Sequence, residues 1–177
     1  MERTFRTLVA LALALTVAAA LLEAPSAAAR SGLAGKRLDA AILSRMNAVR
    51  ASYGLRPLRR NGELATAAKR HSLEMARAGY FAHTSANGGS LAGRLRASYT
   101  VAGRGWAVGE NLLWSSPTVG SLRAMKLWLA SPGHRANVLG LEWKDVGCAA
   151  VHAADAPGVY GNQPVTVVTC DFGRRGR

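Results

Sequence analysis

Apolar residues recur every three or four positions in the first half of the chain, which is the spacing of one face of a helix. One such stripe predicts a helix over Leu38–Tyr53, which the following Gly54 would end. A second stripe predicts a helix over Glu63–Ala78, with Asn61 as its cap and Gly79 at its end. Two amphipathic helices are therefore expected early in the folded domain.

A further stripe leads into the run WLASPGHRANVL, at Trp128–Leu139, and consists of Val119, Leu122, Met125 and Leu129. The helix it predicts stops at Ser131, because a residue before proline is pushed out of the α region. Ser131 and Pro132 also suit the N-cap and the first position of a new helix. His134 would then lie in the first turn, where the helix dipole favours a neutral imidazole. A neutral ring binds a metal or accepts a proton; the alternative is that His134 only caps or packs.

The period of the pattern changes after Gly140. Two segments rich in Val, Cys, Ala and Thr, VGCAAVH and PVTVVTCDF, lack helical stripes and predict two strands, which pair antiparallel by default. A short helix is expected at Ser90–Ser98. With helices at the front, strands at the back and no internal repeat, the fold class is α+β: helices packed against a small antiparallel sheet.

The N-terminal residues have the form of a secretory signal peptide. A basic start precedes an apolar run from Leu8 to Leu22, and small residues follow, so we expect cleavage after Ala28 or Ala29. The alternative is an uncleaved anchor, for which the apolar run is short. The mature protein is then secreted, has no transmembrane segment and is expected to be a monomer. The resulting division is a signal peptide at 1–29, a flexible N-terminus at 30–37, the folded domain at 38–173 and a basic, frayed tail at 174–177.

The chain carries a formal net charge of +13, and the acidic and basic residues of the signal peptide cancel. The mature protein therefore favours anionic partners such as cell-wall polymers or phospholipid head groups. The alternative is a composition bias that only aids solubility. The sequence has no long basic block and no basic strand interleaved with aromatic residues, so no nucleic-acid partner is expected.

The two cysteines, Cys148 and Cys170, each fall in a predicted strand. In an exported protein an even count favours one disulfide, which would stabilise the fold by about 3 kcal/mol. Two buried free thiols are the alternative.

Three polar residues fall on separate predicted elements: His83 in a loop, Glu110 after a glycine turn and His134 at a helix start. Two imidazoles and a carboxylate suit a zinc ion with one position left for water, although their spacing does not show that they meet. Glu110 has the alternative of a structural acid bonded to backbone amides. His71 lies on an apolar helix face and is expected to be a core histidine. No HExxH helix, GxSxG elbow or phosphate-binding glycine loop is present in the sequence.

The ordered motifs HSLEM, FAH, GENLLW, WLASPGHRANVLG and VGCA resemble the CAP superfamily, which includes cysteine-rich secretory proteins, antigen 5 and plant pathogenesis-related proteins. The resemblance is nearest to its compact bacterial branch of SCP-like extracellular proteins and covers Leu38–Phe172. It implies an α-β-α sandwich around a small central antiparallel sheet, with an added strand near Gly109–Trp114.

The resemblance also implies a cleft with two histidines and two acids. The first histidine falls on His83, the acid of the GEN motif on Glu110 and the second histidine on His134. The remaining acid falls on Ser131, so this chain departs from the four-residue pattern and lacks one carboxylate. A strict four-residue catalytic scheme therefore does not carry over.

Binding roles, including sterol and fatty-acid binding, are better supported in the family than catalysis. We therefore predict a non-enzymatic extracellular module that binds a lipid, a wall component or a protein. The alternative is a zinc-dependent hydrolase or peptidase, with His83 and His134 as metal ligands and Glu110 as the candidate catalytic base. Metal sequestration and a purely structural role for the three residues also stay open.

Overall fold

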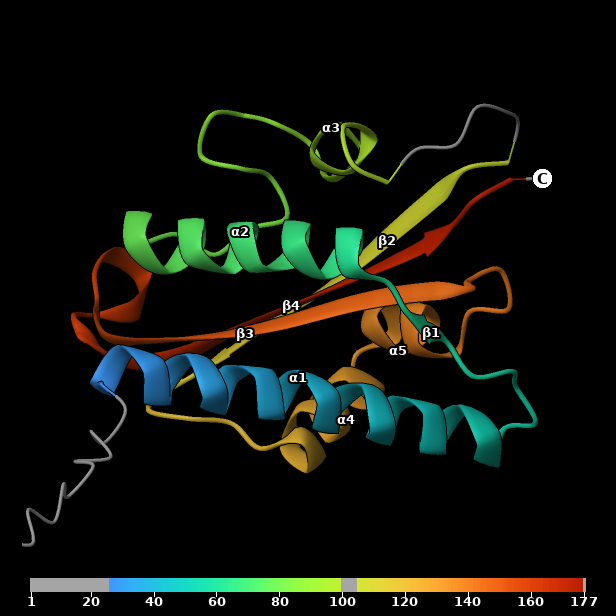
Figure 1. Ribbon diagram of the computed structural model, residues 1–177, viewed down its shortest axis with the longest axis horizontal. Helices are drawn as coiled ribbons and strands as arrows, with labels where there is room; N and C mark the ends of the chain where they lie inside the picture. The colour runs from blue at the N-terminus through green and yellow to red at the C-terminus, as the bar shows by residue number, and fades with distance from the viewer. Residues whose placement is uncertain (1–25, 100–104, 177) are drawn as a thin grey trace, which may run out of the picture.

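The computed structural model describes residues 26–99 and 105–176 (Figure 1). The helices in this part of the chain are α1 (Ala27–Ser52), α2 (Gly62–Ala78), α3 (Leu91–Arg96), α4 (Ser121–Ala130) and α5 (Pro132–Leu139), with a 3₁₀ turn at Gly158–Tyr160. The strands are β1 (Arg59–Arg60), β2 (Ala107–Ser115), β3 (Asp145–Ala156) and β4 (Gln163–Arg174). Residues 1–25, which make up most of the predicted signal peptide, lie outside the described residues.

The strands form one sheet in the order β1-β3-β4-β2, and helices cover both of its faces. Helix α2 packs on one face, with α3 beyond it, while α1, α4 and α5 lie on the other (Figure 1). This arrangement confirms the predicted α-β-α class. The sheet is antiparallel except at the two-residue β1, which pairs parallel with β3. None of the helices in the described ranges is long and apolar enough to cross a membrane.

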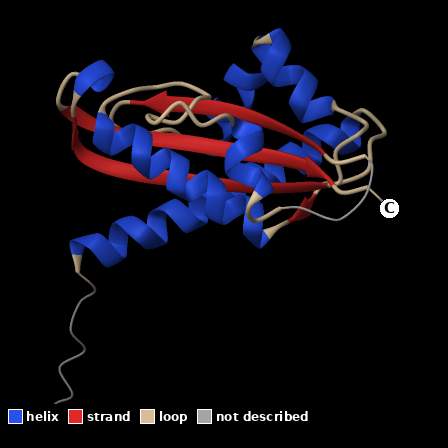
Figure 2. Cartoon of the chain, turned by 90° about the horizontal axis from the view of Figure 1, so that it is seen from above, coloured by secondary structure: helices blue, strands red, loops and turns tan. Residues whose placement is uncertain are grey.

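Strands β3 and β4 form the antiparallel pair that the sequence predicted, and Figure 2 shows the long strands side by side with a common twist. Cys148 lies directly opposite Cys170, and the two form a disulfide with their Cα atoms 4.1 Å apart. β2 pairs with the other edge of β4. The apolar pattern had not identified this strand; only the family resemblance implied it.

The two faces of the sheet bury separate apolar clusters. The larger lies between the sheet and α1, α4 and α5, and includes Ile42, Met46, Met125, Trp128, Val168 and Phe172. On the other face, α2 approaches β3 so closely at Gly147 that a Cβ there would overlap the backbone of Leu64 and Ala65. Glycine is therefore required at this crossing, and it fixes α2 against the centre of the sheet.

Helix α1 begins earlier than the sequence predicted, so the expected flexible segment at 30–37 is helical. The physical reason lies at the edge of β3. Asp39 accepts a hydrogen bond from the Ala150 N–H at 2.5 Å, and Gly35 lies against the Ala150 carbonyl. These contacts cover backbone groups that an unpaired edge strand would leave open.

The predicted apolar stripe of α4 was wrong in one respect. Leu122 is 51% exposed, whereas Trp128, which lies beside that stripe, is 1% exposed. The helix is rotated so that Trp128 faces the sheet. Ser131 does take the N-cap position of α5, but its side chain makes no capping hydrogen bond, which corrects that part of the prediction.

The C-terminal tail is also more ordered than predicted over its described part. Arg174 belongs to β4, and the Arg175 guanidinium lies 4.3 Å from the centre of the Tyr99 ring and pairs with Glu63. Arg177 lies outside the described residues.

Candidate functional site

Two side chains of α2 hold the loop that carries His83. His71 is buried, as expected, and its Nε2–H donates to the Ala82 carbonyl at 2.9 Å. One turn later, Glu74 accepts a hydrogen bond from the Ala86 N–H at 3.0 Å. Both residues lie in the HSLEM motif, so this motif positions the loop around His83.

Glu110 is the centre of the site. Its side chain is nearly fully buried on β2, and one oxygen lies 2.7 Å from His83 Nδ1. The other oxygen accepts from the Arg94 guanidinium, also at 2.7 Å. Arg94 comes from α3 and donates in addition to the His83 carbonyl at 2.6 Å. The carboxylate is thus held between two basic side chains from two different segments.

The neighbouring residue on β2, Asn111, points to the opposite face of the sheet, as alternation along a strand requires. Its amide donates to the His134 carbonyl of α5 at 3.0 Å. Asn137 donates to the Glu110 carbonyl at 3.1 Å, and the Trp128 indole N–H donates to the Leu112 carbonyl, also at 3.1 Å. The GEN motif and the Trp128–Leu139 run therefore lock α4 and α5 onto the free edge of β2.

The charges of the site shift the pKa values of its members in opposite directions. The hydrogen bond that His83 Nδ1–H donates to the Glu110 carboxylate raises the pKa of His83 above its ordinary value. Burial, and then the charge of His83, lower the pKa of His134. Both effects favour the neutral form of the His134 ring.

Asp171 is a fourth member that the sequence did not single out. It lies opposite Glu110 in the β2–β4 pairing and is fully buried. Neither of its carboxyl oxygens has a hydrogen-bond partner within the part of the chain that the structure describes. Burial and the Glu110 carboxylate raise the pKa of Asp171 well above its ordinary value. A buried acid beside a second acid favours its neutral form.

The residues present do not fit the proposed three-ligand zinc site. Both oxygens of Glu110 are already engaged, and the Arg94 guanidinium at 2.7 Å repels a cation placed there. Within residues 26–99 and 105–176, no group of three His, Cys, Asp or Glu side chains is arranged to hold a metal ion. Glu110 as a ligand or catalytic base stays a prediction that this geometry does not favour.

The structure thus brings His83 and Glu110 into contact. The charge of His83 contributes to the lowered pKa of His134. Ser131 adds no acid and makes no capping bond at the start of α5. Sequence reasoning missed Arg94, Asp171 and Asn137. Arg94 gives no local signal among 23 lysines and arginines, because its partner lies 16 residues away on another element.

Comparisons with known proteins identify the family of the chain. The family described as CAP, the cysteine-rich secretory protein family, matches residues 43–172. The chain belongs to the CAP family. No match was found among curated proteins.

Solved structures of bacterial CAP domains are similar. An extracellular protein containing a SCP domain from Bacillus anthracis is 26% identical, with a TM-score of 0.67 over 85% of this chain. This chain spans only 45% of the length of that protein. An outer surface protein of Borrelia burgdorferi is 19% identical, with a TM-score of 0.59 over 76% of this chain and 90% of its own. A cysteine-rich secretory protein of Staphylococcus aureus is 17% identical, with a TM-score of 0.57 over 78% of this chain and 38% of its own. The last two likenesses show the fold alone.

Proposed function

We propose that this CAP-domain chain is a secreted, non-enzymatic binding module for an anionic component of the cell envelope. The observation that carries the proposal is the closed charge pattern around Glu110, whose two oxygens are engaged by His83 and Arg94. A general base or a metal ligand must offer its lone pairs to a substrate or a cation. Here the lone pairs of Glu110 accept hydrogen bonds from the protein itself, so the cluster has a structural role and holds the His83 loop and α3 against β2.

An extracellular location is supported from two sides. The N-terminal residues have the composition of a signal peptide, and the Bacillus and Borrelia proteins are described as extracellular and outer surface proteins. The formal net charge of +13 supports an anionic ligand, because long-range attraction concentrates a basic protein at a negatively charged surface.

The proposal is tested by cosedimentation of the exported chain with phosphatidylcholine vesicles, with and without one quarter phosphatidylglycerol, and with isolated cell-envelope material. We expect binding to the anionic preparations, and we expect the His83→Ala/His134→Ala variant to retain it. Absence of binding to every anionic preparation contradicts the proposal.

A calorimetric zinc titration distinguishes the metal-site alternative. We expect no saturable one-to-one binding that depends on both histidines. Saturable binding in the wild type that is lost in both His83→Ala and His134→Ala would show an open metal site and would favour the hydrolase or sequestration reading instead.

A further inference from the structure

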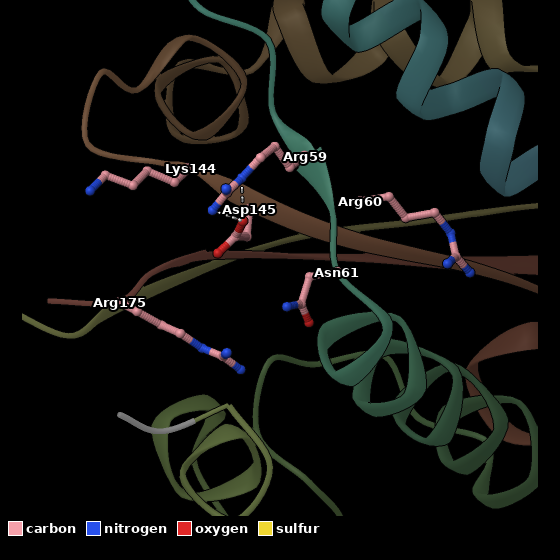
Figure 3. A pocket seen from close by; sticks show the side chains of 6 residues that line it. All are labelled: Arg59, Arg60, Asn61, Lys144, Asp145 and Arg175. Carbon is pink, nitrogen blue, oxygen red and sulfur yellow. Dashed lines mark hydrogen bonds and ion pairs between the residues drawn. The ribbon is translucent and has the colours of Figure 1, made fainter. Parts of the chain in front are cut away.

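A second polar site lies away from Glu110, at the end of the sheet where β1 meets β3. It is a cavity of about 400 Å³ lined by Arg59, Arg60, Asn61, Lys144, Asp145 and Arg175 (Figure 3). These six residues, here called the basic pocket, come from β1, the start of α2, the start of β3 and the C-terminal tail.

The backbone of the basic pocket is held by the sheet. The Arg59 N–H donates to the Lys144 carbonyl, and the Asn61 N–H donates to the Val146 carbonyl, each at 2.9 Å. The basic side chains are therefore mounted on a fixed frame, which lowers the conformational entropy that a bound ligand would have to overcome.

The charges of the basic pocket do not cancel. Asp145 pairs with Arg59 at 3.1 Å, and Glu63, at the start of α2, pairs with Arg175. Among the described residues, Arg60 and Lys144 have no ion-pair partner, so two positive charges are left over. Because these two side chains extend away from each other in Figure 3, they add positive potential around the rim of the cavity and do not meet at one point within it. A phosphate monoester, which carries a charge of about −1.5 to −2 near neutral pH, is attracted by this potential.

Hydrogen-bond donors are also left over. The side-chain oxygen of Asn61 caps α2 by accepting from the Leu64 N–H, and its NH₂ group has no acceptor among the described residues. The buried Nε of Arg175 has no hydrogen-bond partner among residues 26–99 and 105–176. In Figure 3 the Arg175 side chain extends toward Asn61 across the pocket. In the same view the guanidinium of Arg59 also lies near the centre of the pocket, whereas Lys144 and Arg60 extend away from it in opposite directions (Figure 3). Guanidinium and amide N–H groups are donors that phosphate oxygens accept.

We propose that the basic pocket binds a phosphate group. Arg59 and Lys144 also line an adjoining cavity of about 690 Å³, which includes Leu55, Pro57, Leu141 and Trp143. A phosphate ester therefore has room for an attached group next to its charged end, as in a phospholipid head group or a phosphate-linked polymer. This inference rests on the proposed function only for the anionic nature of the natural ligand.

The test is a titration of the isotope-labelled protein with inorganic phosphate, followed by amide chemical shifts at constant ionic strength. We expect saturable shifts around Arg59–Asn61 and Lys144, and an affinity at least fivefold lower in the Lys144→Gln/Arg175→Gln variant. The matched control is Arg123→Gln/Lys126→Gln on α4, which removes the same charge from exposed positions and should leave the affinity unchanged. Equal losses in both variants, or shifts scattered over the whole basic surface, would overturn the phosphate pocket.

A vesicle arm identifies the source of the phosphate. If Lys144→Gln/Arg175→Gln weakens binding to phosphatidylglycerol vesicles more than the α4 control does, the pocket holds lipid head groups. If phosphate binding falls but vesicle binding does not, the pocket holds a soluble or polymeric phosphate. If the wild-type protein binds neither vesicles nor envelope material, the proposed function is contradicted. The phosphate pocket is not, because the phosphate titration measures it separately.

Discussion

The cluster around Glu110 and the basic pocket use similar side chains but compensate their charges differently. At Glu110, a buried carboxylate is shared by His83 and Arg94, and the ring of contacts closes on itself. In the basic pocket, exposed Arg60 and Lys144 are left without an acid. The first arrangement favours stability, because every buried charge has a partner, and the second favours binding, because it needs a partner from outside.

The largest expected effect is on stability, at the centre of the closed cluster. Glu110→Ala removes the acid that faces the Arg94 guanidinium, whose side chain is only 14% exposed. We expect the free energy of unfolding to fall by about 3 kcal/mol, because a mostly buried charge is left unpaired. Urea denaturation measures the change.

A double-variant cycle provides the control. Replacing Arg94 as well as Glu110 by alanine should cost less than the sum of the two single changes, since the second removes the charge that the first leaves unpaired. Strictly additive losses would contradict the ion pair.

Asp171 should be replaceable despite its burial. Because burial and Glu110 raise the pKa of Asp171, the folded state keeps a proton that the unfolded chain releases. Stability therefore falls as pH rises above the ordinary aspartate pKa of about 4. We expect Asp171→Asn to remove this dependence and to stay within about 1 kcal/mol of the wild type at neutral pH. A loss above about 3 kcal/mol in urea unfolding would show instead that the charged form is required.

A smaller effect is expected at His83, which is more exposed. Its pKa in the folded state is raised by the hydrogen bond with Glu110. Its contribution to stability is therefore fully present below about pH 6.5 and is lost as pH rises through the raised pKa. Thermal unfolding of His83→Gln across this range should show a flatter pH profile than the wild type. If the stability of both proteins depends on pH in the same way, the hydrogen bond between His83 and Glu110 does not contribute to stability.

The smallest effect on stability should come from the basic pocket. Lys144→Gln/Arg175→Gln removes one unpaired charge, one solvent-accessible ion pair and the stacking of Arg175 on Tyr99, so we expect a total change of about 1 kcal/mol or less. The same urea experiment measures it. A loss of unfolding free energy as large as that of Glu110→Ala would mean that the basic pocket also has a structural role.

The sequence determined the elements whose signals are local. The cap at Asn61 and the stop at Gly79 define α2 within one residue of the prediction, because caps act on the adjacent backbone. The change of period after Gly140 identified β3 and β4, and the two cysteines on them formed the expected disulfide. The motifs in order identified the family, and with it β2.

Only the tertiary structure decided the rest, because it depends on partners that are distant along the chain. The α1 start follows from the edge of β3, where Asp39 meets the Ala150 N–H 111 residues away. The choice of Arg94 as the partner of Glu110 comes from the packing of α3 beside β2. The basic pocket is assembled from β1, β3 and the tail, each of which looks like ordinary solvated charge when the sequence is taken alone. Long-range pairing leaves no periodic trace in the sequence, so these contacts could be seen only once the chain was folded.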